Sequence, residues 1–213
     1  MIRIGFRTGM RIGTISDLKV DTIARSLPDP QIPGWHRINV GPGAHPPVST
    51  KFGVTGEILI SDAEIKLLLN YIGSTQRLMR VAKAPGIHRD LVFLTRNGTP
   101  YFSSGARQGR ALSMGIFRLR KLGAETKNSS VANFHFHQTR ATFATELVKI
   151  LLRVTNAETA LGFVKDALLH KNESTTLKYI QFVERTEAVA ACADAFTQDF
   201  LQIPLSAHQA NDS

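Results

Sequence analysis

The spacing of apolar residues changes along the chain from a two-residue period to a period of three to four residues. Residues 35–40 and 54–60 alternate between apolar and polar side chains, as half-buried β-strands do, and glycines and prolines break the chain between them. These two segments predict a small antiparallel sheet. Before them, residues 2–18 have a helical pattern interrupted at Thr8-Gly9, and the proline-rich residues 28–34 predict a loop.

From position 61 onward the pattern is almost entirely helical. Ser61 and Glu64 form a capping-box signature in front of one helix, and Thr155 and Glu158 form another. A short apolar run at 91–94 is followed by a turn. Further helices are predicted over residues 112–122, 137–152, 158–169, 174–183 and 186–203. The fold is therefore predicted to be mainly α with a small antiparallel β-sheet (α+β).

The last predicted helix has an apolar face. Its members are Val189, Cys192, Phe196, Phe200 and Ile203. Such a stripe either folds back on the core of its own chain or packs against another molecule, and the pattern leaves both open.

Length and composition indicate one sizeable domain without a cofactor. The chain has 213 residues, of which 43% are apolar, enough to build a core. Cys192 is the only cysteine, which excludes internal disulfides and cysteine-rich metal sites. No apolar run is long enough to span a bilayer, and no spacing of histidines and acids demands a metal. We therefore expect a cytoplasmic protein with no metal, no cofactor and no membrane partner.

The charge distribution favours a polyanionic partner. Lys and Arg number 26 against 17 Asp and Glu, which gives a formal net charge of +9. Between Lys66 and Lys121 eleven basic residues accompany a single acid, whereas from Glu184 onward five acids accompany Arg185 alone. Clustered cations bind phosphates and release the counterions condensed on them. Double-stranded DNA fits this balance, and so does a basic surface that only keeps the protein soluble.

Three local patterns contain residues that can bind an oxyanion or act as a nucleophile. Arg11 follows a glycine near the start of the chain. His137 and Arg140 lie three apart on a predicted helix, so both side chains project from one face. His170 ends one predicted helix, and Tyr179 follows on the next. Each pattern alone also fits a structural role: a surface arginine, a hydrogen-bonded histidine, or a tyrosine with its ring in the core.

In this order and with these neighbours, the patterns resemble the catalytic domain of the tyrosine recombinases, the phage integrase family. TGMRIGTISDL is similar to the family's first-arginine box, and HFHQTRATFATEL to the box with its histidine and second arginine. VKDALLHKNESTTLKYIQF resembles the box that ends in the nucleophilic tyrosine, and STKFGVTGEILIS the β-hairpin with Lys51 at the catalytic lysine. The resemblance covers nearly the whole chain and implies the fold of the DNA breaking-rejoining enzymes.

The resemblance also implies a metal-free reaction that needs no ATP. Arg11 and Arg140 would stabilise the charge on a pentavalent phosphorane, because guanidinium groups bind phosphate oxygens bidentately and stay protonated. His170 would hydrogen-bond a non-bridging oxygen. Lys51 would protonate the leaving 5′-oxygen.

Tyr179 is the nucleophile in this scheme. A phenol with a pKa of about 10 is a poor nucleophile at neutral pH, so His137 would take its proton. The implied product is a 3′-phosphotyrosyl link with a free 5′-hydroxyl. A 5′-hydroxyl from a partner strand then attacks the link and rejoins the DNA.

Three positions depart from the family pattern. Thr14 stands where the family usually has an acid. Leu169 stands where a glycine usually precedes the last histidine, which would shift His170 slightly. The loop between Val40 and Lys51 is longer than expected. None of these departures removes a reacting group.

We expect residues 1–184 to form an N-terminally incomplete catalytic domain without the family's core-binding domain. Residues 185–213 would form a C-terminal helix and tail, either folded back or exchanged between protomers. The resemblance further implies a homo-tetramer on DNA, accessory directionality or DNA-bending proteins, and a nucleoid-associated protein of bacterial or phage origin. Two other functions fit the same residues, namely relaxation of DNA by a type IB topoisomerase and DNA binding by a non-cleaving recombinase remnant.

Overall fold

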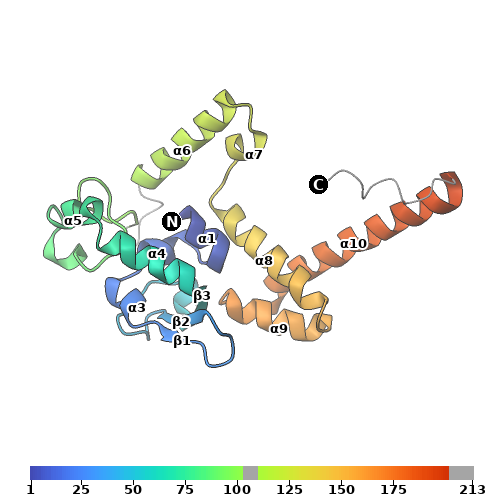
Figure 1. The fold of residues 1–213 in the computed structure, drawn as a ribbon, viewed down its shortest axis with the longest axis horizontal. Helices are drawn as coiled ribbons and strands as arrows, with labels where there is room; N and C mark the ends of the chain where they lie inside the picture. Colours follow the sequence, from blue (N-terminus) through green and yellow to red (C-terminus); the bar gives the residue numbers. More distant parts are fainter. Residues whose placement is uncertain (103–109, 202–213) are drawn as a thin grey trace.

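A computed structural model describes residues 1–102 and 110–201; for Arg110, residues 189–190 and residues 192–201 it describes the backbone alone (Figure 1). In chain order the elements are α1 (Ile2–Thr8), α2 (Ile12–Ser16), α3 (Val20–Ala24), β1 (Leu27–Pro28), β2 (Trp35–Val40), η1 (Lys51–Gly53), β3 (Gly56–Ser61), α4 (Asp62–Ile72), α5 (Thr75–Val81), η2 (Gly86–His88), α6 (Arg110–Glu125), α7 (Ser129–Ala132), α8 (His137–Leu152), α9 (Ala157–Ala167) and α10 (Glu173–Leu201). The prediction of a mainly helical fold with a small antiparallel sheet is confirmed.

The sheet is the centre of the first hydrophobic core. Its strands lie in the order β1-β2-β3, all antiparallel, with Ile38 opposite Ile58. Alternate residues of β2 and β3 point into the core, where Ile38, Val40, Ile58 and Ile60 are buried against α1, α3 and α4. Both predicted strands are therefore confirmed, although β3 begins two residues later than predicted.

The loop predicted over residues 28–34 is confirmed for residues 29–34, whereas Pro28 ends a short edge strand, β1. β1 pairs with β2, with Leu27 opposite Arg37. Proline is tolerated at an edge, where its missing N–H leaves no ladder bond unmade. The turn that follows is closed by Asp29, whose carboxylate accepts hydrogen bonds from the backbone N–H groups of Gln31 and Ile32 and from the guanidinium of Arg37.

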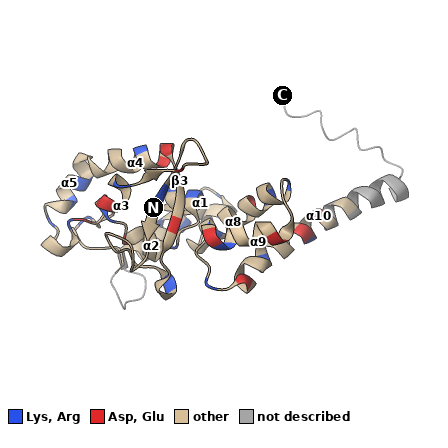
Figure 2. Ribbon diagram, turned by 90° about the horizontal axis from the view of Figure 1, so that it is seen from below, with Lys and Arg blue, Asp and Glu red and all other residues tan. Residues whose placement is uncertain are grey.

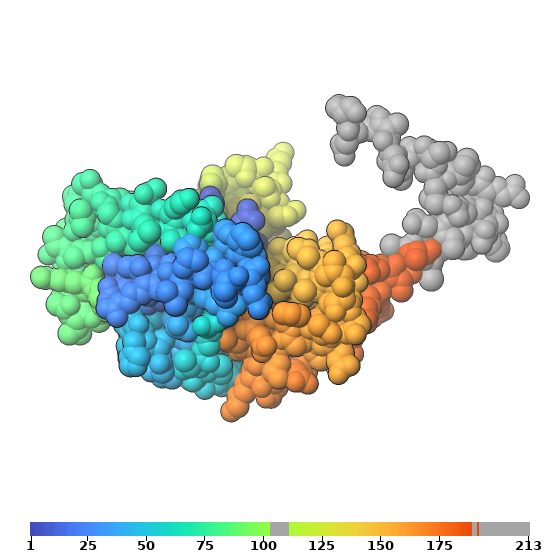
Figure 3. All heavy atoms as spheres, turned by 60° about the horizontal axis from the view of Figure 1, so that its bottom comes forward, coloured from blue at the N-terminus to red at the C-terminus, as the bar shows by residue number. Residues whose placement is uncertain are grey.

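A second hydrophobic core lies between α8, α9 and α10. Its buried members are Ala144, Val148, Ala160, Val164, Leu168, Ile180 and Val183. Phe143, Leu147 and Leu151, which are spaced four residues apart on α8, pack against this cluster and are partly buried. Figure 3 shows these C-terminal helices, in yellow and orange, directly against the blue N-terminal helices and the cyan sheet. The contact surface between the two cores is where the candidate site residues lie.

Several predicted helix ends are wrong. α9 is capped by Asn156, whose side chain accepts from the backbone N–H of Thr159 at 2.8 Å, and not by Thr155. The two helices predicted over 174–183 and 186–203 are one continuous helix, α10, because no glycine or proline interrupts the segment between them. The Thr186 hydroxyl bonds back to the Phe182 carbonyl at 2.7 Å within this helix. The predicted apolar stripe from Val189 to Ile203 lies outside the described side chains.

Three short helices, α3, α5 and α7, were not predicted. α5 is capped by Ser74 and α7 by Asn128, each through a side chain that accepts a backbone N–H. Figure 2 shows basic residues on α4 and α5, of which Lys66 on α4 is exposed and Arg77 on α5 is buried. Within the described residues, no helix combines the length and the apolar character needed to cross a membrane.

Candidate active site

Four segments from different parts of the chain meet between the two cores. They are the link from α1 to α2, the turn η1 that precedes β3, the start of α8, and the link from α9 to α10. The first link begins at Gly9, which ends α1 with φ at 64°, a left-handed conformation that glycine adopts readily. A Cβ added there would lie 2.5 Å from the ring of Phe143 and 2.7 Å from Leu168. Glycine therefore lets α8 and α9 approach this link closely.

Arg140 is buried at this meeting point, with 3% of its surface exposed. Its Nη1 donates to the carbonyl oxygen of Gly9 at 2.7 Å and its Nη2 donates to that of Leu168 at 2.5 Å. These carbonyls belong to the C-caps of α1 and α9, where the helix dipoles place partial negative charge. Burial and the nearby charge of Arg11 still lower the pKa of Arg140 to about 9. The guanidinium is thus held in one orientation and remains a cation at neutral pH.

Arg11 is the N-cap residue of α2 and is half-buried. Its side chain lines a small cleft together with Lys51, Arg140, Thr14 and Leu169. Burial lowers the pKa of Arg11, and attraction to the Tyr179 phenol partly offsets this effect. Among the described residues that line the cleft none carries a carboxylate, since Thr14 occupies the position where the family usually has an acid. The cleft is therefore cationic and suited to an anion.

Lys51 begins the turn η1 and is exposed at the mouth of the same cleft. Its ammonium lies 4.9 Å from the centre of the Phe52 ring. The turn is closed by the Thr50 hydroxyl, which donates to the Val54 carbonyl at 2.5 Å, and by the Gly53 N–H, which donates to the Thr50 carbonyl at 3.2 Å. Both contacts hold the backbone on either side of Lys51.

His137 is the first residue of α8 and lies at the protein surface. Partial burial of the ring lowers its pKa, and the charges of Arg140, Arg11 and Lys51 lower it further. The imidazole is therefore neutral at pH 7 and can accept a proton.

His170 is buried and follows α9. Its Nδ1 lies 2.8 Å from the Thr176 hydroxyl, and its ring is parallel to that of Tyr179, with 5° between the planes and 6.4 Å between the centres. Burial, followed by the charges of Arg140 and Arg11, lowers the pKa of His170 to about 4. This imidazole is also neutral at pH 7.

Leu169 adopts the backbone conformation that a glycine would. Its φ is 49°, in the left-handed region that costs a non-glycine residue about 1–2 kcal/mol. Its side chain packs over Gly56 of β3, where an added Cβ would lie 2.5 Å from Leu169 Cδ2. The departure from the family pattern thus keeps the turn ahead of His170 and fills the space above the strand.

The structure brings all six predicted site residues into one region. Arg11, Lys51 and Arg140 line one cleft. In addition to burial, the charges of the two arginines lower the pKa values of His137 and His170. Tyr179 partly offsets the lowering of the pKa values of both arginines by burial. The sequence analysis missed Thr176, which precedes Tyr179 by three residues and so lies on the same face of α10. Across the described part of the chain, no group of three or more His, Cys, Asp or Glu side chains is placed to hold a metal ion.

Once the fold and the geometry of this cluster are known, a comparison with family models identifies the family of the chain. A model of the phage integrase family matches residues 1–185, and the chain belongs to that family. A comparison with curated protein sequences gave no match.

Two solved structures place the fold among tyrosine recombinases and integrases. The XerH site-specific recombinase, bound to palindromic difH substrate in a post-cleavage complex, is 19% identical with a TM-score of 0.57, over 89% of this chain and 43% of that one. The Tn1549 transposon integrase, in complex with transposon right end DNA, is 15% identical with a TM-score of 0.56, over 90% of this chain and 57% of that one. The chain thus spans about half the length of the structures that it matches.

Proposed function

We propose that the protein is a site-specific DNA recombinase that cuts and rejoins DNA through a 3′-phosphotyrosyl intermediate formed on Tyr179. The single observation that carries the proposal is the convergence of two arginines, two neutral histidines, a lysine and a tyrosine between the two cores. Family membership supports the same reaction, and the two similar structures are complexes with DNA.

In the proposed reaction the Tyr179 oxygen forms a bond to phosphorus and the bond from phosphorus to the 5′-oxygen breaks. Arg11 and Arg140 bind the non-bridging oxygens and neutralise the charge that develops on them. Arg140 suits this role because two backbone carbonyls already fix its orientation before DNA binds. The two arginines thereby stabilise the charge that a metal ion stabilises in other phosphoryl-transfer enzymes. The energy of the broken phosphodiester bond is kept in the phosphotyrosyl ester, so rejoining the DNA needs no ATP.

Proton transfer is assigned to His137 and Lys51. The proton of Tyr179 goes to His137, whose lowered pKa keeps the ring free to accept it. Lys51 gives a proton to the departing 5′-oxygen from the mouth of the cleft. His170 donates from Nε2 to a non-bridging oxygen, provided that Thr176 donates its hydroxyl proton to Nδ1 and so fixes the tautomer.

Covalent trapping on nicked duplexes tests the proposal. The duplexes carry candidate and randomised attachment sequences, and the nick lets the cleaved fragment diffuse away, so the protein–DNA link persists after denaturation. The chain has three tyrosines, so Tyr71→Phe and Tyr101→Phe are matched controls for Tyr179→Phe. We expect a shifted band with the wild type and both controls, and its complete loss with Tyr179→Phe.

The other outcomes separate the competing functions. A band that persists in Tyr179→Phe would refute the assignment of the nucleophile. Relaxation of supercoiled plasmid by a protein that never exchanges strands between two duplexes would indicate a type IB topoisomerase. DNA binding without any covalent band would indicate a recombinase remnant that binds but does not cut.

We further propose that the protein acts as a homo-tetramer on double-stranded DNA, with help from directionality or DNA-bending proteins, and that the end of α10 is exchanged between protomers. On the described part of α10, the buried side chains are those of Thr176, Ile180 and Val183, whereas the side chains of residues 184–188 and Ala191 are exposed. The helix projects beyond α8 and α9 (Figure 1). A chain that ends at Thr186 should bind DNA but form a smaller complex, measured by light scattering; an unchanged mass would refute the exchange.

A further inference from the structure

A hydrogen bond connects α2 to the chain that leads into Lys51. The backbone N–H of Ser49 donates to Oδ2 of Asp17 at 2.7 Å, across 32 positions of sequence. Ser49 lies two residues before Lys51, at the point where the long loop after β2 returns toward the cleft. This bond anchors the loop directly ahead of the turn that presents the lysine.

Asp17 and Arg11 lie at opposite ends of the same helix. Arg11 is the N-cap residue of α2 and Asp17 is its C-cap residue, with five helical residues between them. α2 is held in the first core by Ile15, which is fully buried. The Ser16 hydroxyl donates to the Ile12 carbonyl at 2.7 Å within the helix. One short, packed helix therefore sets the position of Arg11 directly and that of the Lys51 loop through Asp17.

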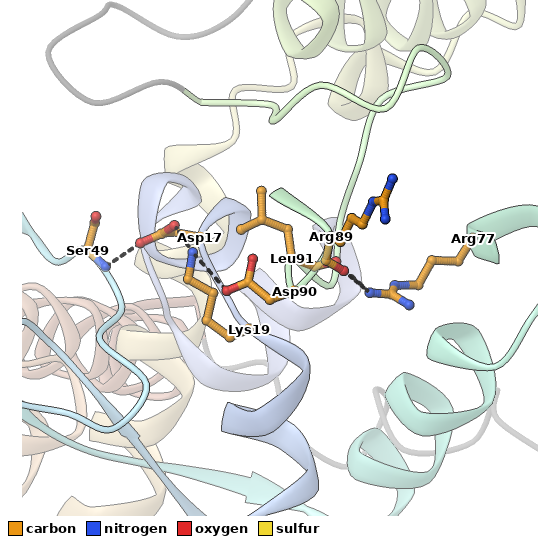
Figure 4. Close-up of polar contacts among 7 residues, drawn as sticks. All are labelled: Asp17, Lys19, Ser49, Arg77, Arg89, Asp90 and Leu91. Atoms are coloured by element: carbon orange, nitrogen blue, oxygen red, sulfur yellow. Dashed lines mark hydrogen bonds and ion pairs between the residues drawn. The ribbon is translucent and has the colours of Figure 1, made fainter. Parts of the chain in front are cut away.

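Asp17 is itself held in place by a chain of polar contacts (Figure 4). The Lys19 ammonium lies 2.9 Å from Asp17 Oδ1 and 3.9 Å from Asp90 Oδ2. The backbone at Asp90 is fixed in turn, because its carbonyl accepts from Val20 N–H at 2.7 Å. Lys19 and Asp17 are 16% and 28% exposed in their side chains, so the pair is partly shielded from solvent.

The far end of this network is the buried guanidinium of Arg77. Its Nη2 donates to the carbonyls of Arg89 and Leu91, and its Nε donates to that of Val92. These bonds fix the main chain on both sides of Asp90, as Figure 4 shows. Because Arg77, Asp90 and Lys19 are fixed in this way, the Asp17 carboxylate is presented to Ser49 in one orientation.

We propose that Asp17 is a positioning residue for the leaving-group step: by accepting the Ser49 N–H, it places Lys51 where its ammonium protonates the 5′-oxygen. The inference rests on the proposed function, since it assumes that Lys51 supplies this proton. Since the contact of Asp17 is with the backbone ahead of Lys51, Asp17 affects the protonation of the leaving 5′-oxygen. Arg11, in contrast, affects the binding of the non-bridging phosphate oxygens. A shift of about 1 Å in a reacting group can lower a rate by up to about 100-fold.

A DNA substrate with a better leaving group distinguishes this role from a structural one. When sulfur replaces the bridging 5′-oxygen at the scissile phosphate, the leaving group is a thiol with a pKa of about 8.5, which departs without protonation. A defect in placing Lys51 then disappears, whereas a defect in folding, DNA binding or phosphate contacts remains. Single-turnover rates of covalent-complex formation are measured on both substrates.

We expect Asp17→Ala to cleave the oxygen substrate about 10- to 100-fold more slowly than the wild type and the sulfur substrate within about threefold of it. Lys51→Ala should show the same rescue. Asp17→Asn keeps an oxygen that can accept the Ser49 N–H and should remain within about threefold of the wild type on both substrates. Asp21→Ala is the matched control, because Asp21 is an exposed acid on the neighbouring α3 that pairs with Arg25.

Equal slowing of Asp17→Ala on both substrates would overturn the proposal, and so would rates unchanged from the wild type on both. If Asp17→Ala fails to fold, as judged by circular dichroism, Lys19→Met decides the question. It removes the contact that orients the Asp17 carboxylate, so it should slow cleavage of the oxygen substrate but not of the sulfur substrate. Equal slowing on both substrates, or unchanged rates on both, would overturn the proposal. The absence of cleavage by the wild type on either substrate would instead contradict the proposed function.

Discussion

The guanidinium of Arg140 donates a hydrogen bond of 2.7 Å to the carbonyl oxygen of Gly9, which lies 131 positions earlier in the chain. With its second bond, to Leu168, Arg140 joins the first core to the second. The same side chain that would bind the scissile phosphate therefore also holds the fold together. A buried cation with two fixed acceptors cannot be replaced by one of different shape.

Arg140→Lys is expected to affect stability and chemistry together. A lysine ammonium cannot reach two acceptors in the geometry of a guanidinium fork, so at least one buried carbonyl loses its partner, at a cost of about 1–3 kcal/mol. Urea denaturation should show this loss in the free energy of unfolding. Covalent-complex formation should fall by more than about 100-fold. Full stability in the variant would mean that the two carbonyls find other donors.

Thr176→Val should disturb His170 without changing the shape of α10 much. Valine has the volume of threonine but no hydroxyl, so Nδ1 of the buried ring loses its partner at a cost of about 1–2 kcal/mol. We also expect a slower rate of covalent-complex formation, by about tenfold, because the tautomer and orientation of the ring are no longer fixed. Thr176→Ser keeps the hydroxyl and is the control; if both variants behave alike, the hydrogen bond is irrelevant.

The stability of the protein should fall on acidification in a window set by His170. Its pKa is about 4 in the folded chain and 6.5 in the unfolded chain, so between these values the unfolded chain binds the extra proton. Stability from this residue is complete above pH 6.5 and decreases as the pH falls toward 4. Thermal unfolding of the wild type and His170→Gln from pH 7 to 4.5 should show a smaller loss in the variant. Parallel pH profiles would contradict the lowered pKa.

The strain at Leu169 can be measured by comparing two substitutions that both remove its contact with Gly56. At φ of 49° alanine retains the left-handed penalty and glycine does not. Leu169→Gly should therefore be more stable than Leu169→Ala by about 1 kcal/mol, even though glycine costs more entropy on folding. Equal stabilities in denaturant titrations would mean that the turn relaxes in the alanine variant.

Local patterns predicted most of the elements, because the spacing that marks a helix or a strand lies within that element. The six site residues were predicted from the resemblance to tyrosine recombinases, since Arg11, Lys51 and His170 lie in links or turns whose spacing gives no such signal. The two-residue period gave β2, and the helical spacing of His137 and Arg140 placed both at the start of α8. The break predicted between the helices at 174–183 and 186–203 was wrong, because no glycine or proline there ends the helix. A single leucine also gives no sign that its φ will be positive, since the turn at Leu169 is imposed by tertiary packing.

The contacts that position the site were beyond sequence reasoning for a different reason. Arg140 with Gly9 and Asp17 with Ser49 join segments 131 and 32 positions apart, and each pair uses a backbone group that every residue type carries. A backbone acceptor or donor leaves no mark in the sequence. Thr176 is the exception, because its spacing of three residues from Tyr179 predicts that both side chains lie on the same face of α10.

α10 has a mechanical consequence for Tyr179. The tyrosine lies in the second turn of a helix that continues without interruption for 22 further residues, about 33 Å, to Leu201. Ile180 and Val183 are buried and anchor the helix next to the phenol, and the rest of the helix extends beyond this anchor. If the helix is twisted or tilted near Leu201, the Tyr179 side chain rotates about the anchored residues Ile180 and Val183. We therefore expect a molecule that binds the far end of α10 to change the orientation of the Tyr179 phenol.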